Sequence, residues 1–147
     1  MSTEDPKRVP TGSGESAPRR RTILVVDDEA DMLENITRIF RRTPHECLTA
    51  AGGREALALL ERHLPDLVLT DLRMPGLDGL ALLRAIKRVS PDTPVVIFTA
   101  YASDSAAGEA IRAGATAFLP KPFSAAQLLE TVQDALAPLD ARRPPPA

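Results

Sequence analysis

Apolar residues along the chain follow two alternating patterns, short continuous runs and repeats with helical spacing. The continuous runs are typical of strands buried on both faces of a sheet. They occupy residues 23–26, 67–69, 95–98 and 117–119, and residues 47–50, which include Thr49, form a weaker strand candidate. Between them, apolar side chains recur every three or four residues, as on one face of a helix, within 32–40, 56–64, 80–89 and 128–136. This alternation predicts an α/β domain whose parallel sheet carries helices on both faces.

The segment 103–114, between the last two predicted strands, is an unusual helix candidate. It is rich in alanine, contains Gly108, and has Ile111 as its one large aliphatic residue. A glycine inside a helix costs about 1 kcal/mol relative to alanine. We therefore expect this helix to be the least firmly docked of the five.

The two ends of the chain differ from its middle. Half of the 14 prolines lie in residues 1–21 and 138–147, where large apolar side chains are almost absent. Such segments cannot offset the entropy lost on ordering, so we predict flexible tails around a single domain, 22–137. The tails carry net charges of +2 and +1 in a chain of net charge −2, which leaves −5 on the domain. A domain this acidic is a poor binder of nucleic acid.

The composition excludes several classes of protein. No apolar run approaches the roughly 18 residues of a membrane span. The run that follows Arg19–Arg21 is too short for the core of a signal peptide. The single cysteine, Cys47, excludes a disulfide framework and a multi-cysteine zinc site. We expect a cytoplasmic protein that does not contact membranes.

Polar side chains follow four of the five predicted strands, at the point where each strand ends. Asp27 and Asp28 follow the first strand, Asp71 the third and Thr99 the fourth, and the fifth runs into Lys121. The carboxyl ends of parallel strands share one edge of the sheet, where ligands bind. We therefore expect these five side chains to lie together.

Three carboxylates at one edge would repel one another, by about 4 kcal/mol for a pair at ~4 Å and an effective dielectric constant near 20. A divalent cation removes this cost, and an all-oxygen ligand set favours Mg²⁺. Zinc is not expected, because neither His45 nor His63 lies at a strand end. Carboxylates with Mg²⁺, a lysine and a threonine are suited to phosphoryl transfer, and a carboxylate can itself be the nucleophile. Asp71 is the candidate nucleophile, with Asp27 and Asp28 holding the metal.

Four segments resemble the signature motifs of the receiver domain of two-component response regulators. They are Leu24–Glu29, Thr70–Gly79, Phe98–Ala100 and Lys121–Phe123, in the order found in that family. The resemblance covers essentially all of 22–137. It implies a flavodoxin-like, doubly wound, five-stranded parallel sheet with strand order 2-1-3-4-5.

The resemblance also implies a phosphoryl-transfer site. Asp71 would accept a phosphoryl group from a sensor histidine kinase or a histidine phosphotransfer protein, with Mg²⁺ as cofactor and Mn²⁺ as a possible substitute. Asp28, Asp71 and the backbone carbonyl of Arg73 would bind the metal directly, and Asp27 mainly through water. Lys121, together with Thr99, would contact the phosphoryl oxygens, and the peptide bond before Pro122 would be cis.

Three further positions have implied roles in how the signal is kept and passed on. Phe118 matches the family's switch aromatic, and the alternative interpretation is a plain core residue. Arg73 and Tyr101 occupy positions that influence how long the phosphate survives in this family. The surface formed by 103–114, 117–119 and the last helix would meet a downstream protein or a second copy of the chain.

Other classes of function are kept as alternatives. Haloacid-dehalogenase-like phosphatases also use a nucleophilic aspartate, but they need a second aspartate two residues later. Here Arg73 follows Asp71 at that spacing, and Glu29 follows Asp27. We therefore expect a phosphoacceptor that catalyses at most its own phosphorylation and dephosphorylation, and not an enzyme.

A further alternative is the regulatory receiver of a transcription activator, cut out of a longer protein. The segments around Phe98 and Phe118 resemble receivers that precede ATPase-type activators. Only ten residues follow Ala137, and the chain starts with Met1. On these grounds we expect a stand-alone receiver that signals through protein contacts.

Overall fold

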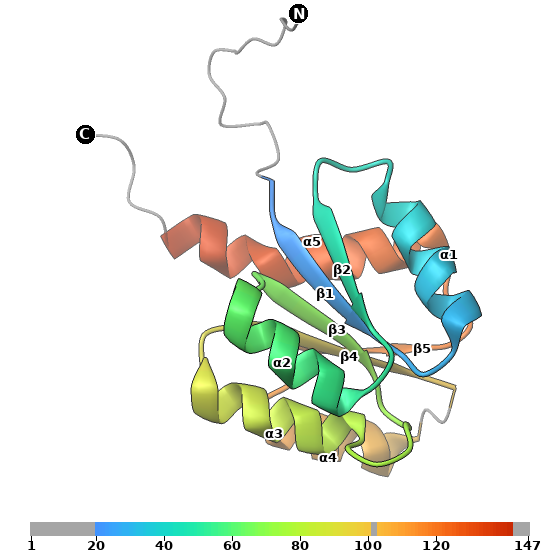
Figure 1. Ribbon diagram of the computed structural model, residues 1–147, viewed down its shortest axis with the longest axis vertical. Coiled ribbons are helices and arrows are strands. Elements are labelled where there is room, and N and C mark those ends of the chain that lie inside the picture. Colours follow the sequence, from blue (N-terminus) through green and yellow to red (C-terminus); the bar gives the residue numbers. More distant parts are fainter. Residues whose placement is uncertain (1–19, 101–102, 143–147) are drawn as a thin grey trace, which may run out of the picture.

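Strands and helices alternate strictly through the whole fold (Figure 1). The computed structural model describes residues 20–100 and 103–142. The elements are β1 (Thr22–Val26), α1 (Ala30–Phe40), β2 (Glu46–Ala50), α2 (Gly53–His63), β3 (Leu67–Asp71), α3 (Gly79–Val89), β4 (Val95–Thr99), α4 (Asp104–Arg112), β5 (Ala117–Pro120) and α5 (Ala125–Arg142). Each predicted strand and helix is present, with its ends shifted by a few residues at most except in α5.

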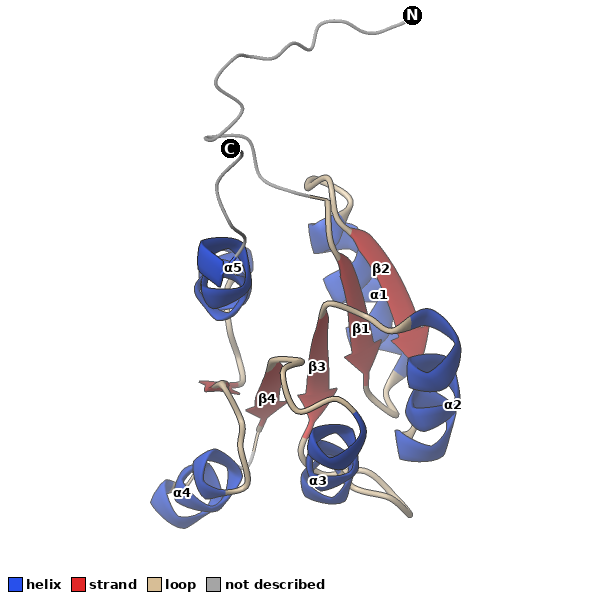
Figure 2. Cartoon of the chain, turned by 90° about the vertical axis from the view of Figure 1, so that its left-hand side faces the viewer, coloured by secondary structure: helices blue, strands red, loops and turns tan. Residues whose placement is uncertain are grey.

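The five strands form one parallel sheet in the order β2-β1-β3-β4-β5. This confirms the fold class and the strand order expected from the sequence. Helices α1 and α5 cover one face of the sheet, and α2, α3 and α4 cover the other (Figure 2). Every residue of the central strands β3 and β4 is buried, because helices cover these strands on both faces.

Helix α5 extends further than the sequence predicted. It continues through Pro138 to Arg142, whereas we expected a flexible tail from residue 138. Proline removes one helical hydrogen bond, but Leu136 is buried and Leu139 packs partly buried against the same core cluster. This packing keeps the helix in place beyond the proline.

The fold also begins slightly earlier than expected. Arg21, which we assigned to the flexible tail, is 9% exposed, and its carbonyl accepts a hydrogen bond from the Glu46 backbone N–H at 2.8 Å. Residues 1–19 and 143–147 lie outside the described part of the chain. Within the described part, no helix is both long enough and apolar enough to cross a membrane.

Candidate functional site

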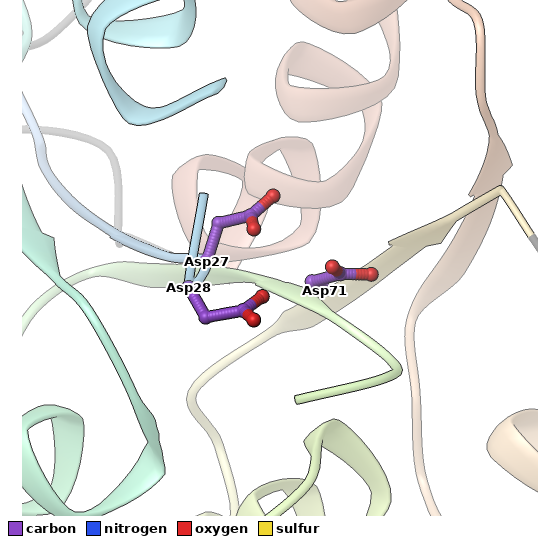
Figure 3. A group of neighbouring side chains, drawn as sticks. All are labelled: Asp27, Asp28 and Asp71. Carbon is purple, nitrogen blue, oxygen red and sulfur yellow. The ribbon is translucent and has the colours of Figure 1, made fainter. Parts of the chain in front are cut away.

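Three aspartates meet at the carboxyl edge of the sheet. Asp27 and Asp28 directly follow β1, and Asp71 ends the neighbouring strand β3 (Figure 3). One carboxylate oxygen from each lies within 4.8 Å of the other two. Asp27 and Asp71 are buried and Asp28 is exposed. The structure therefore brings together the three acids that the sequence placed at strand ends.

The ammonium group of Lys121 lies between these acids. Its Nζ is 3.4 Å from Oδ2 of Asp27, 3.5 Å from Oδ2 of Asp71 and 3.9 Å from Oε1 of Glu29. The Lys121 side chain is only 12% exposed. One cation therefore balances several carboxylates. Sequence reasoning did not assign Glu29 to this site, although it directly follows the Asp27-Asp28 pair.

The charges of the two buried acids are only partly compensated. Burial raises the pKa of Asp27 to about 6, and the charge of Asp71 adds to this effect. The Glu29 backbone N–H, which donates to Oδ1 of Asp27 at 2.8 Å, and Lys121 lower that pKa but do not cancel the shift. Burial also raises the pKa of Asp71, against the opposing effect of Lys121. A further positive charge would stabilise the charged forms of these carboxylates, and their oxygen atoms are ligands that suit a hard divalent cation.

The strand ends position the remaining predicted residues. Thr99 ends β4 and is fully buried, and its carbonyl accepts a hydrogen bond from the Lys121 backbone N–H at 2.8 Å. The Lys121–Pro122 peptide bond is cis, as the resemblance implied. Phe118 pairs with Ile97 in the sheet and packs, partly buried, against the core beneath α2, α3 and α4. Tyr101 lies outside the described residues.

The loop between β3 and α3 is held close to Asp71 by a glycine. A Cβ on Gly79 would overlap the carbonyl oxygen of Asp71, and the Gly79 N–H donates to the carbonyl of Leu72 at 2.9 Å. The Asp78 side chain caps α3 by accepting from the Ala81 N–H at 2.9 Å. These contacts fix the loop that carries Arg73, whose side chain is exposed.

An aromatic pair that sequence reasoning missed lies beside Lys121. The ammonium is 5.0 Å from the centre of the Phe98 ring, within the range of a cation–π interaction. Phe123 meets the same ring edge-on, with centroids 5.9 Å apart and an interplanar angle of 87°. Phe98 is fully buried, so it restricts the positions that the lysine side chain can occupy.

Comparison with known proteins identifies relatives over most of the chain. The family model described as the response regulator receiver domain matches residues 23–133. The DNA-binding transcriptional regulator NtrC of Salmonella typhimurium is 40% identical over 118 residues, which are 80% of this chain and 25% of that protein. The chain thus spans about a quarter of the length of these curated relatives.

Solved structures show the same fold over nearly the same range. A response regulator receiver domain protein from Clostridium thermocellum superposes with a TM-score of 0.79 at 33% identity, over 84% of this chain and 99% of that one. NtrX from Brucella abortus gives a TM-score of 0.80 at 38% identity, over 85% of this chain and 28% of that one.

Proposed function

The chain belongs to the response regulator receiver domain family, and from this membership we propose that Asp71 accepts a phosphoryl group from a phosphohistidine. The donor would be a sensor histidine kinase or a histidine phosphotransfer protein. One observation carries the assignment to Asp71. Asp71 ends a central strand and is 6% exposed, and its carboxylate lies with Lys121 and two further acids at one edge of the sheet.

The chemistry needs a nucleophile and a way to neutralise the transferred group. An oxygen of Asp71 would attack the phosphorus in line with the P–N bond of the donor. As that bond breaks, an acyl phosphate forms, and the imidazole leaves neutral because it keeps the proton that its other ring nitrogen carries in the donor. Lys121 would turn from pairing with Asp27 and Asp71 to pairing with a phosphoryl oxygen. The Thr99 hydroxyl would donate to another of these oxygens.

The acidic edge fits a divalent cation through its donor set. Asp28, Asp71 and the carbonyl of Arg73 would hold Mg²⁺, or Mn²⁺ in its place, directly, and Asp27 would hold it through water. When bound, the cation would offset the carboxylate charges and bind the phosphoryl oxygens. The raised pKa of Asp27 supports this role, because burial disfavours the charged carboxylate and a bound cation would favour it.

The signal would leave the site through β4 and β5. Movement of the Thr99 hydroxyl toward the phosphoryl group would free space beside Phe118, whose ring could then turn inward. The surface of α4, β5 and α5 would consequently change, as a population shift biased by a local charge. That surface would act on a downstream protein, on a second copy, or on an output domain like those of the NtrC-type relatives.

The proposal predicts no turnover of an external substrate, so the chain would act as a phosphoacceptor and not as an enzyme. Arg73 and Tyr101, two residues after Asp71 and Thr99, would set the lifetime of the acyl phosphate. The exposed side chain of Arg73 lines a surface hollow with Met74, Pro75 and Asp78. From there it could limit access of water to the acyl phosphate.

The decisive test replaces the acceptor by its uncharged isostere. The Asp71→Asn variant should gain no phosphoryl mass after incubation with acetyl phosphate and Mg²⁺, as measured by intact-protein mass spectrometry. Asp134→Asn, which changes an exposed carboxylate on α5, is the matched control and should gain the same mass as the parent. An undiminished gain in Asp71→Asn, with the fold intact by circular dichroism, would place the acceptor elsewhere.

A further inference from the structure

A cavity of about 370 Å³ lies between α1, the α1–β2 loop and α5. It also contacts Arg21, immediately before β1. Because the strands are parallel, their starting ends lie opposite the edge that carries Asp27 and Asp71. Figure 1 shows the start of β1 and the α1–β2 loop together at the upper end of the sheet. The cavity is therefore separate from the acidic site.

The lining of the cavity has an apolar floor and a polar rim. Phe40 of α1 and Leu129, Val132 and Leu136 of α5 form the floor. Arginine, threonine, histidine and glutamine side chains stand around it, and none of the described lining residues is acidic. An occupant that matches this lining has a large apolar group next to a negative charge.

The rim is built on a loop that is already fixed. The Thr43 hydroxyl donates to the carbonyl of Phe40 at 2.7 Å and accepts from the His45 backbone N–H at 3.1 Å. The Arg21 backbone N–H donates to Nδ1 of His45 at 3.1 Å, so the neutral imidazole carries its proton on Nε2. A site on a fixed loop loses little conformational entropy when it binds.

The described residues that line the cavity include two arginines and no acid, in contrast to the acidic domain as a whole. The predicted domain, 22–137, carries −5, but Arg41 and Arg42 lie side by side in this loop and both are exposed. Within the described part of the chain, neither of them forms an ion pair. Arg21 is buried and pairs with Asp66 at 3.5 Å. Of the two loop arginines, Arg42 lines the cavity, so the positive charge at the opening comes mainly from Arg42, with Arg41 next to it in the sequence.

We propose that this cavity is a docking site for an acidic segment of a partner protein. The segment inserts one large apolar side chain between α1 and α5 and places its carboxylates against Arg42 and Arg41. The volume suits this occupant, because small binding pockets range from about 300 to 1,000 Å³. The apolar contact provides affinity, and the arginines select against basic segments. Docking here does not require the phosphoryl-transfer function proposed above.

The first test uses the whole chain labelled with ¹⁵N and three synthetic peptides. One contains a single phenylalanine among aspartates and glutamates, the second has lysine and arginine at the charged positions, and the third has alanine for phenylalanine. We expect saturable shifts at 42–45 and 129–136 with the first peptide. The other two peptides should bind at least ten-fold more weakly. Equal binding of the basic peptide, or shifts confined to other surfaces, would overturn the proposal.

Variants at exposed positions locate the contact. Arg42→Glu should weaken the acidic phenylalanine peptide at least ten-fold, and Gln133→Trp, which fills the opening from α5, should abolish the shifts. Arg88→Glu makes the same charge change on the exposed surface of α3 and should bind as the parent does. Parent-like binding by Arg42→Glu and Gln133→Trp would refute the site. Sedimentation distinguishes another occupant: concentration-dependent dimers that Arg42→Glu abolishes, without peptide binding, would make the cavity an interface between copies and contradict the proposal.

Discussion

Helices α3 and α4 are neighbours on one face of the sheet, yet they bury very different surfaces (Figure 2). Each follows a strand that ends at the acidic edge. α3 buries Leu82, Leu83 and Ile86 almost completely, whereas Ala110 is the one buried residue among the described side chains of α4. Ile111, the largest aliphatic residue of α4, is 50% exposed. The difference suggests that α3 is part of the frame that holds the site and that α4 is free to respond to it.

The contact between the two helices is correspondingly weak. Arg84 of α3 and Glu109 of α4 pair at 3.9 Å, with both side chains more than half exposed. Exposed pairs of this kind contribute roughly 0–1 kcal/mol. Segments that move in a switch come from the least stable parts of a structure, and α4 has the small buried surface that such a segment needs.

The largest effect should come from truncating a buried leucine of α3, and the matched change in α4 should have a much smaller effect. Leu82→Ala should lower the free energy of unfolding by about 2–5 kcal/mol, because it removes a fully buried side chain and leaves a cavity. Ile111→Ala should cost less than about 1 kcal/mol, since half of that side chain already contacts water. Urea denaturation with matched slopes measures both. A cost for Ile111→Ala as large as that for Leu82→Ala would show that α4 is as firmly docked as α3.

Next in size is the effect of the buried Asp27 charge, which destabilises the folded state at the acidic edge that α3 helps to frame. Burial raises the pKa of folded Asp27 to about 6 from an unfolded value of 3.8, so the folded state binds this proton more tightly. The associated stability is complete below pH 3.8 and is lost as the pH rises through 6. In EDTA, Asp27→Asn should therefore be more stable than the parent at pH 8, by an amount on the order of 2 kcal/mol, and similar to it at pH 4.

Thermal and urea unfolding at the two pH values measure this difference. Asp134→Asn, on the exposed face of α5, should show no such pH dependence relative to the parent. If Asp27→Asn is less stable than the parent at pH 8 without metal, Lys121 already compensates the charge and the case for a cation is weakened.

Local pattern was sufficient to predict much of this molecule. Aspartates at the ends of β1 and β3 predicted the acidic edge, because parallel topology fixes where strand ends meet. The weak docking expected for α4 agrees with its small buried surface. The exposure of Ile111 depends on how α4 packs, and it could not be predicted from the place of Ile111 in the sequence.

Other features depend on contacts between distant segments. The extension of α5 past Pro138 depends on how Leu139 packs against the core, and proline alone indicated the opposite. The Phe98 ring beside Lys121 and the approach of Gly79 to Asp71 bring together residues whose spacing has no simple pattern. For Gly79, the preceding Asp78, a good helix cap, was a usable signal. Glu29 could have been added to the site because it continues the acidic run after β1.

A smaller effect is expected from stiffening α4. Gly108→Ala removes a helix-weakening residue, which stabilises a helix by up to about 1 kcal/mol. A Cβ there would meet only the end of the flexible Arg112 side chain, at 3.2 Å, so the new methyl group should fit. Hydrogen exchange of α4 amides should slow, while that of α3 stays unchanged. Faster exchange in α4 would mean that the glycine is required for its packing.

A phosphoryl group on Asp71 should change α4 and β5 and leave the anchored helices α2 and α3 unchanged. Hydrogen exchange with and without beryllofluoride and Mg²⁺, which mimic the phosphorylated state, measures this difference. Amides from 103 to 118 should change protection clearly more than those of α2 and α3 (53–63 and 79–89). Equal changes in all three segments, or no change from 103 to 118, would contradict the switch and leave phosphorylation to act through charge alone.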